Sequence, residues 1–374
     1  MCIWKPSEAA FGSAYQVLLR KIKQFLDRET ANNRTTKAFG KTWLKNSFRN
    51  LTYLKNPIFF EPGSIPCIVA GAGPSLEEAI PLIVKALQQG PLLIVAAASA
   101  VPALLEHRIV PTLSVATDGG TWAAFHLFDQ LRRVRQISTQ QSNSLPFSLA
   151  VMLYAKTCSQ AAQVPQIIIS DGSQWQQRFL ALLGIPFLQL PQRGTVSATL
   201  IDLALFLTTG KIYITGMDMG IRDIQTHARP YGLDFYLEER VNHLSPLYSI
   251  KFTRLHNGAN TQALDVYAHW FDWYFANNRD RISVLGSKHP RFSMLPASEN
   301  IYWDVSTEPA FYGMSSKIPI EQYSPTSLVS LFCSNILHSE DNEQMRQELS
   351  YLITGRRIHL SVPEIEKELT ELFT

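Results

Sequence analysis

The chain has 374 residues, of which 46% are hydrophobic and 17% are charged, and its formal net charge is +3. These values indicate a soluble globular protein with one large domain and appended segments. The longest uncharged apolar stretch, Leu92 to Leu105, is fourteen residues long, whereas a membrane helix needs about 20. The composition therefore excludes a membrane-spanning protein.

The start of the chain lacks the basic and smoothly apolar pattern of a secretion signal, because Trp4, Lys5 and Pro6 interrupt it. The four cysteines lie far apart, without the spacing of a zinc site or a disulfide framework. We therefore expect a reduced, cytoplasmic location and no metal site.

Positive charge is concentrated at the start of the chain. Residues 1–60 hold eleven Lys and Arg against three Asp and Glu, a local charge of +8 that leaves −5 for the remainder. Apolar residues at helical spacing predict an amphipathic helix over Tyr15–Asp27, and a polar stretch, Glu29–Lys37, is expected to separate it from a second helix over Trp43–Leu54. Such an arm can bind an acidic partner, anionic lipid or nucleic acid, or it can be a solvated helical face.

From Pro66 onward, short buried strands alternate with helices, which predicts βαβ units and a parallel sheet. The expected fold is α/β, a doubly wound, mostly parallel Rossmann-like sheet with helical N- and C-terminal extensions. The expected strands are 67–70, 92–97, 113–117, 166–170, 187–190 and 211–215, and the expected helices are 75–88, 100–106, 175–183 and 197–207.

The later sequence is less regular. Residues 219–260 form a long segment rich in Tyr, His, Arg and Asp, which predicts a functional loop or lid. A helix is expected over Gln262–Ala276, with Tyr267, Trp270, Phe271 and Trp273, and two or three helices after Pro325. We therefore expect a basic helical arm (1–60), a transferase domain (61–310) that contains the lid 219–260, and a helical extension (311–374).

The run Gly71-Ala72-Gly73-Pro74-Ser75 lies between a predicted strand and a predicted helix. Small residues allow a ligand to approach the backbone, and free amides at a helix start favour an anion. Leu76 replaces the third glycine of the nicotinamide fingerprint, and no P-loop lysine follows, so neither NAD nor a P-loop kinase is indicated. The alternative interpretation is a glycine turn that only packs the helix against the strand.

Two further junctions carry polar groups. Arg193-Gly194-Thr195-Val196-Ser197 again joins a predicted strand to a helix and can hold a phosphate, or Thr195 and Ser197 can be ordinary helix caps. Asp118 follows the third predicted strand and is expected in the same crevice as Gly73, where it can bind a sugar, a base or a metal ion. Alternatively, Asp118 is a turn former before Gly119.

The densest polar cluster follows the strand 211–215 and contains Asp218, Arg222, Asp223, Thr226 and His227. A neutral histidine near carboxylates can draw a proton from a hydroxyl, so His227 is the candidate general base. Tyr231, Tyr236 and Tyr248 can bind a departing phosphate, or they can be half-buried anchors.

The run from Gly194 to Ala228, together with the glycine motif at residues 71–76 and Asp118, resembles the bacterial motility-associated factor proteins, which share a domain with the archaeal 6-hydroxymethylpterin diphosphokinases. The resemblance extends over roughly residues 40–310, from Arg49-Asn50-Leu51 to Ser306-Thr307-Glu308.

The resemblance implies a glycosyltransferase with a core similar to bacterial sialyltransferases. It would move a nonulosonic acid from a CMP-activated donor to Ser or Thr of flagellin, without a metal or another cofactor. The resemblance implies His227 as the catalytic base, and as donor-binding residues Gly71, Gly73, Pro74, Ser75, Thr195, Ser197 and Tyr231 or Tyr236. From their positions at the strand ends, Asp218 is a further catalytic candidate, and Asp118 and Gly194 are further donor-binding candidates.

Two alternatives remain open at this stage. One is pyrophosphoryl transfer from ATP to a hydroxymethylpterin, in which Mg²⁺ would bind Asp118, Asp218 or Asp223. The other is a non-catalytic module that binds a protein such as flagellin through the basic arm and the aromatic residues 270–273. The expected partners are an activated sugar and a protein acceptor, not nucleic acid.

Overall fold

The computed structural model describes residues 5–138, 147–256, 271, 274–275, 278, 280–289, 291–303, 311–314, 323–338 and 342–374. The chain divides into two compact units, one of Met1–Lys45 with Thr326–Thr374 and one of Asn46–Pro325.

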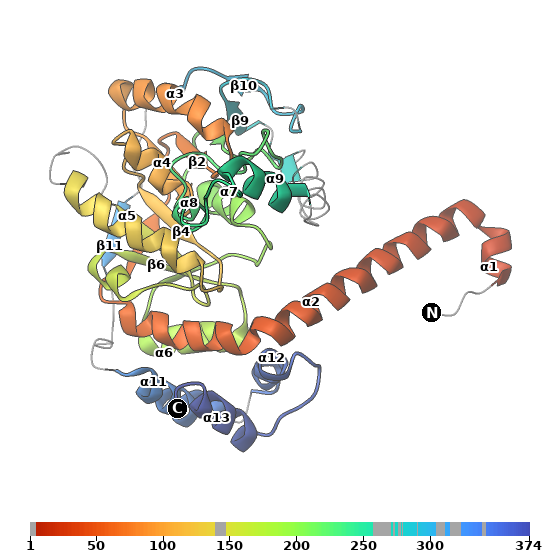
Figure 1. Ribbon diagram of the computed structural model, residues 1–374. Helices are drawn as coiled ribbons and strands as arrows, with labels where there is room; N and C mark the ends of the chain where they lie inside the picture. The colour runs from red at the N-terminus through yellow and green to blue at the C-terminus, as the bar shows by residue number, and fades with distance from the viewer. Residues whose placement is uncertain are drawn as a thin grey trace. The chain divides into compact units, whose positions relative to one another are not determined.

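A nine-stranded parallel sheet forms the centre of the unit Asn46–Pro325 (Figure 1). Its spatial order is β10-β9-β8-β2-β3-β4-β5-β6-β7. The strands are β2 (Cys67–Ala70), β3 (Leu93–Ala97), β4 (Leu113–Ala116), β5 (Ser148–Met152), β6 (Gln166–Ser170), β7 (Phe187–Gln189), β8 (Ile212–Thr215), β9 (Ile282–Leu285) and β10 (Ala297–Ser298). The predicted α/β doubly wound fold is confirmed.

Helices flank the sheet, as expected for strands that are buried on both faces. They are α3 (Ser75–Gln89), α4 (Val101–Glu106), α5 (Ala123–Ser138), α6 (Gln174–Leu183) and α7 (Val196–Leu207). Every residue of β2, β3, β4, β5, β6 and β8 is buried. The six predicted strands and four predicted helices are all present, within two residues at each end.

The order of the strands reverses at β2. The chain runs from β2 through β3, β4, β5 and β6 to β7 on one side and then returns to form β8 on the other side of β2. Ala70 pairs with Ala96 of β3 and with Thr215 of β8, so the three strands end at the same level. In sheets of this kind, ligands bind just beyond the carboxyl ends of the strands at the point of reversal.

Several elements were not predicted. They are α5, β5, β9, β10 and the two-stranded antiparallel sheet of β1 (Ile58–Glu61) and β11 (Phe311–Met314). Beyond β8, the described part of the segment 219–260 contains two short helices, α8 (Asp234–Glu238) and α9 (Leu247–His256). Of the helix expected over 262–276, Tyr267, Trp270 and Trp273 lie outside the described residues, whereas Phe271 and Phe275 are fully buried.

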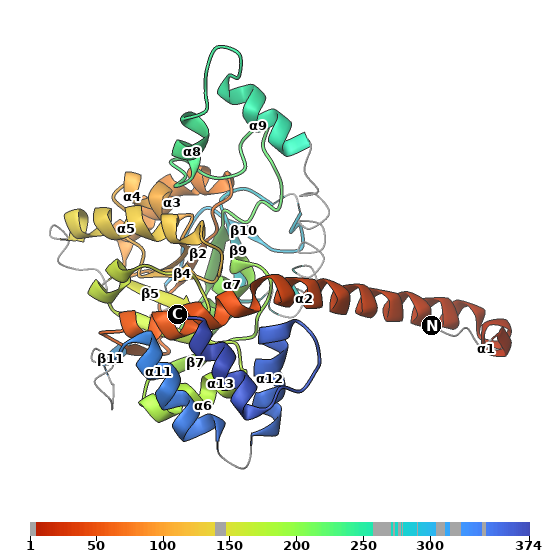
Figure 2. The ribbon, with the colours of Figure 1, turned by 60° about the horizontal axis from the view of Figure 1, so that its bottom comes forward.

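The unit Met1–Lys45 with Thr326–Thr374 is helical (Figure 2). Its elements are α1 (Lys5–Ala10), most of α2 (Gly12–Tyr53), α11 (Pro325–Phe332), the π-helical turn η3 (Cys333–Leu337), α12 (Glu343–Thr354) and α13 (Val362–Glu371). The helices expected after Pro325 are therefore present. The predicted break over Glu29–Lys37 is wrong, because α2 continues through it.

Tertiary contacts explain the continuity of α2. Glu29 forms an ion pair with Arg357 at 2.6 Å, and Tyr351 donates a hydrogen bond to Asn33 at 2.6 Å. At Gly40, a Cβ atom would lie 2.0 Å from the carbonyl oxygen of Leu352, so α2 approaches the backbone of α12 closely. Glu29 and Asn33, two of the polar residues that suggested a loop, instead contact the C-terminal part of this unit.

Candidate functional site

The loops that follow β2 and β8 are hydrogen-bonded to each other. The amide of Gly71 donates to the carbonyl of Thr215 at 2.8 Å, and the amide of Gly73 donates to the carbonyl of Gly216 at 2.7 Å. A Cβ atom at Gly73 would lie 2.1 Å from Oδ2 of Asp218. Glycine is therefore required here for the close approach of the two loops, as the packing interpretation of this motif expected.

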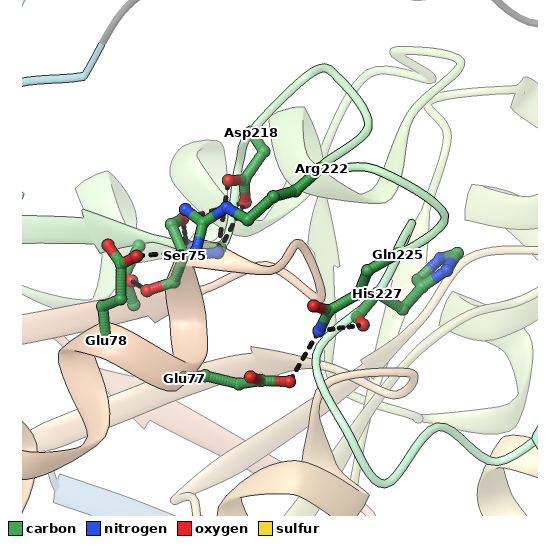
Figure 3. Close-up of polar contacts among 9 residues, drawn as sticks. Ser75, Glu77, Glu78, Asp218, Arg222, Gln225 and His227 are labelled. Atoms are coloured by element: carbon green, nitrogen blue, oxygen red, sulfur yellow. Dashed lines mark hydrogen bonds and ion pairs between the residues drawn. The ribbon is translucent and has the colours of Figure 1, made fainter.

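The side chain of Asp218 occupies the N-terminal end of α3 (Figure 3). Its carboxylate accepts hydrogen bonds from the Ser75 amide at 3.1 and 3.2 Å and from the Ser75 hydroxyl at 2.8 Å. The next amides, Leu76 and Glu77, donate to the carbonyls of Gly73 and Pro74 at 3.1 and 3.2 Å. The positive end of the α3 dipole thus already faces a carboxylate of the protein itself.

Glu77, in the first turn of α3, holds the segment that carries His227. Its Oε1 atom accepts a hydrogen bond from Nε2 of Gln225 at 2.7 Å (Figure 3). The same atom accepts a bond from the Arg229 amide at 2.8 Å. The Ala228 amide also donates to the carbonyl of Ala72 at 2.8 Å. Hydrogen bonds to residues before and after His227 in the sequence therefore fix it beside the glycine motif.

The imidazole ring of His227 points away from Asp218 and Ser75 (Figure 3). Its Nδ1 atom lies 2.8 Å from the hydroxyl of Thr226, and the ring stacks on Tyr231 at 3.9 Å between centroids and 11° between planes. The two predicted catalytic residues thus stand in different surroundings. Asp218 joins two loops, and His227 belongs to an aromatic cluster.

That cluster includes His126 of α5, which the sequence analysis did not single out. Its ring centroid lies 5.2 Å from that of Tyr231. Burial lowers the pKa of His126, while the charge of Asp118 acts in the opposite direction. Within the described part of the chain, Nδ1 of His126 is buried without a hydrogen-bond partner. No spacing signal marked His126, because α5 itself was not predicted.

Asp118 connects this cluster to the ends of β5 and β6. Its Oδ1 atom accepts a bond from the Gly120 amide at 2.8 Å, which is the turn-forming role considered above, and its side chain is exposed. Tyr154 is buried and hydrogen-bonds to Gln192. Burial, with the charges of Asp171 and Asp118, raises the pKa of Tyr154. Two carboxylates and a buried phenol therefore share the carboxyl edge of the sheet.

The start of α7 returns from the sheet edge toward its centre. β7 is the last strand of the sheet, but α7 contacts β2, β3 and β4. Thr195 is the N-cap residue of α7 and makes no side-chain capping bond. Gly194 has φ +76°, and Ser197 is partly exposed in the first turn. The hydroxyl capping considered for this junction is thus not seen at Thr195, and no acidic residue lies in the first turn of α7.

Arg193 does not extend freely beside α7. Its Nε atom forms an ion pair with Asp202 at 2.8 Å, and the hydroxyl of Tyr274 donates to Asp202 at 2.6 Å. Of the two tyrosines implied by the resemblance, Tyr231 stacks with His227, whereas Tyr236 of α8 packs edge-on against Trp122 at 5.1 Å.

Cavities among the described residues lie beside Tyr231 and Asp218. A cavity of about 1150 Å³ between α4, α5 and α8 is lined in part by Phe125, Arg229, Tyr231 and Gly232. A smaller one of about 420 Å³, beyond the ends of β8 and β9, is lined in part by Asp218 and His289. In the part of the chain that the structure describes, no three His, Cys, Asp or Glu side chains gather in a way that could bind a metal ion.

His289 is the second histidine that the sequence analysis did not single out. Its Nδ1 atom accepts bonds from the amides of Arg291 and Phe292 at 3.1 and 3.2 Å. Burial lowers the pKa of His289, and the charge of Asp218 opposes the shift. Because Nδ1 is an acceptor, this ring is held in one neutral tautomer.

Residues 41–223 match the family model described as 6-hydroxymethylpterin diphosphokinase MptE-like. The chain therefore contains an MptE-like domain, and the resemblance inferred from the glycine motif and the β8 loop is confirmed. The match ends four residues before His227, so most of the lid segment 219–260 lies outside it. No described helix combines the length and apolarity that crossing a bilayer requires.

Two further proteins are similar to parts of this chain. An uncharacterized protein of Treponema pallidum (strain Nichols) is 25% identical over 291 residues, which is 76% of this chain and 59% of that protein. The solved MAf glycosyltransferase of Magnetospirillum magneticum AMB-1 is 16% identical, covers 49% of this chain and 28% of its own, and has a TM-score of 0.35. The chain thus spans less than two thirds of either relative.

Proposed function

We propose that this chain is a glycosyltransferase. It would move a nonulosonic, sialic-acid-like sugar from a CMP-activated donor to a protein hydroxyl, with Ser or Thr of flagellin as the acceptor. The observation that carries the proposal is the clamped segment 225–231, which holds His227 against Tyr231 beside the glycine motif of the MptE-like domain.

His227 is suited to act as a general base. If Nδ1–H donates to the Thr226 hydroxyl, 2.8 Å away, the lone pair is on Nε2. That atom would take the proton of the acceptor hydroxyl as its oxygen attacks the sugar carbon. The bond from the sugar to the phosphate would break, and CMP would leave with the negative charge.

The departing phosphate needs a positive or hydrogen-bonding partner. The start of α7 supports this role, because its amides face a position without a side-chain cap or an acidic neighbour. Thr195 and Ser197 would add hydroxyls there, and Gly194 would allow close approach. Asp218 instead acts on the donor indirectly, by fixing the loop of Gly71, Gly73, Pro74 and Ser75 that would face the nucleotide.

The implied tyrosines divide between two roles in this proposal. Tyr231 would contact the donor beside His227, and Tyr236, which packs under Arg240 at 4.2 Å, would steady the phosphate together with that cation. Asp118 would bind a sugar hydroxyl. The scheme demands no metal or further cofactor, and the three free cysteines that the structure describes fit a reducing cytoplasm.

Thermal unfolding in the presence of ligands tests the donor. We expect CMP to raise the melting temperature, and ATP or a hydroxymethylpterin to leave it unchanged. The opposite result would remove the glycosyltransferase proposal.

A single-turnover assay tests the base. With a CMP-activated nonulosonic acid and flagellin, His227→Ala should lose about 10² to 10⁴ in rate. The control is His243→Ala, an exposed histidine of the same lid segment. Equal losses in both variants would refute the role of His227, and binding of flagellin without any turnover would favour a non-catalytic module.

Pyrophosphoryl transfer from ATP to a hydroxymethylpterin is a second candidate, favoured by the description of the matching family. It would use Mg²⁺ held by carboxylates such as Asp118, Asp218 or Asp223. Magnesium dependence separates the candidates, because transfer that stops with a chelator and recovers with Mg²⁺ would favour this one.

A further inference from the structure

The first part of α2, and Phe11 just before it, expose large apolar side chains. Phe11, Leu18, Ile22, Phe25 and Leu26 are between 36% and 67% exposed. Residues 11–26, called the amphipathic segment, precede Glu29, whose ion pair with Arg357 connects α2 to the C-terminal part of the same unit. The segment also precedes the MptE-like domain, which begins at residue 41, so the proposed transferase chemistry does not explain it.

Apart from the exposed Val17, the large apolar side chains of this segment lie on one broad face. At about 100° per residue, they cover an arc of about 120° of the helix. The members of this face are Tyr15, Leu18, Leu19, Ile22, Phe25 and Leu26. A seam between two coiled-coil helices is narrower and is normally sustained over three or more heptads. A face this broad, on a segment of about two heptads, is better matched by a flat apolar surface.

The charged residues of the segment indicate which kind of flat apolar surface it would bind. The segment carries Arg20, Lys21 and Lys23 and no acidic residue. By the same angular count, Lys21 and Lys23 flank the apolar arc on its two sides, and Arg20 is opposite to it. Flanking cations around an aromatic and aliphatic face are typical of helices that lie in the interface of an anionic bilayer.

We propose that the amphipathic segment binds the surface of an anionic lipid bilayer, with its apolar face in the headgroup region and its lysines at the lipid phosphates. The helix would lie in the plane of the membrane and would not cross it. A single helix of this kind gives weak, reversible attachment, which is strengthened by each basic residue. The protein would therefore be held near a membrane without a spanning segment.

Vesicle flotation of the full chain tests this proposal. We expect the protein to float with vesicles of phosphatidylcholine and phosphatidylglycerol, and not with phosphatidylcholine alone. Raising the salt from about 0.05 M to 0.5 M should release it, because screening shortens the reach of the charges. Lys21→Gln and Lys23→Gln should each lower the partition coefficient about fivefold.

Leu18→Asp tests the apolar face, and Gln16→Asp, on the polar face, is its matched control. Both add one negative charge and lower helix propensity by a similar amount. Leu18→Asp should reduce partitioning at least tenfold further than the control, because it also removes a leucine side chain from the apolar face that enters the headgroup region. Circular dichroism checks that both variants keep their helix content.

Three results would overturn the proposal. One is equal flotation of Leu18→Asp and Gln16→Asp, and another is failure of the unmodified protein to float with anionic vesicles. The third is a lipid-free dimer, measured by light scattering, that Leu18→Asp converts to a monomer. That last result would assign the apolar face to a second copy of the chain.

Discussion

Replacement of Asp218 separates a structural role from a catalytic one. Asp218 was a catalytic candidate from its position after a strand, but its carboxylate accepts three hydrogen bonds from Ser75 at the start of α3. We therefore expect Asp218→Ala to destabilise the protein. Asp218→Asn keeps an oxygen acceptor and should have a smaller effect.

The magnitude follows from two contributions. Losing an N-cap acceptor costs about 1 kcal/mol, and losing a partly buried charge at the positive end of a helix costs roughly 0.5 to 1 kcal/mol more. We expect the free energy of unfolding to fall by about 2 kcal/mol in Asp218→Ala and by about 1 kcal/mol in Asp218→Asn. For a unit of this size, the first corresponds to roughly 4 to 8 °C in Tm.

The assay is denaturant unfolding followed by circular dichroism, with Asp223→Asn as control. Asp223 is an exposed carboxylate of the same loop, and its φ of +54° is one that asparagine tolerates. The control should stay within about 0.5 kcal/mol of the unmodified protein. Our reasoning is refuted if Asp218→Ala is as stable as the control. It also fails if folded Asp218→Asn loses a hundredfold in turnover at unchanged stability, because the carboxylate would then act in catalysis.

Three further predictions concern the same unit. Gly73→Ala should unfold the protein or lower its free energy of unfolding by more than about 2 kcal/mol, because the new Cβ would lie 2.1 Å from Oδ2 of Asp218. The control is Gly220→Ala, whose Cβ would lie 3.6 Å from its nearest atom and which should keep its stability in the same unfolding assay. Burial lowers the pKa of His126 below 6.5. As the pH falls below about 6.5, the unfolded state takes up the proton first, so the free energy of unfolding decreases. Denaturant unfolding at several pH values should show a weaker pH dependence of stability in His126→Phe, and an unchanged pH dependence would contradict this. Burial raises the pKa of the Cys67 thiol, which keeps it protonated and unreactive. Mass spectrometry should therefore find Cys67 unlabelled by a thiol reagent in the native protein at pH 8 and labelled after unfolding. Rapid labelling of the native protein would contradict this prediction, because it would show that strand β2 opens.

The central strands could be read from the sequence because burial on both faces leaves a strong local signal. Cys67–Ala70 and Gln166–Ser170 are runs of small or β-branched residues next to turn residues, and their bounds agree with β2 and β6. β10 has only two residues, and β1 is paired with a strand about 250 residues away in the chain. Such strands depend on partners that a local pattern does not contain.

The break predicted in the N-terminal helix was wrong for a related reason. Glu29 and Asn33 are polar and suggest a loop when they are read alone. In the structure they contact Arg357, just after α12, and Tyr351 of α12, so the C-terminal segment provides the partners that keep α2 helical.

In the candidate site, too, some features were predictable from the local sequence and others depend on tertiary contacts. Sequence alone identified the glycine motif, the β8 loop and His227, because these residues are contiguous in the chain and stand at strand ends. It also determined the α/β class, through the alternation of buried strands with helices.

Only the tertiary structure decided which of these residues meet. In the folded chain, Asp218 binds the start of α3, and His126 of α5 lies beside Tyr231. Helix α7 follows the edge strand β7 but packs on the central strands. The physical reason is that local patterns report burial and backbone preference, whereas the order of strands and the contacts between loops depend on which surfaces pack together after the chain has folded.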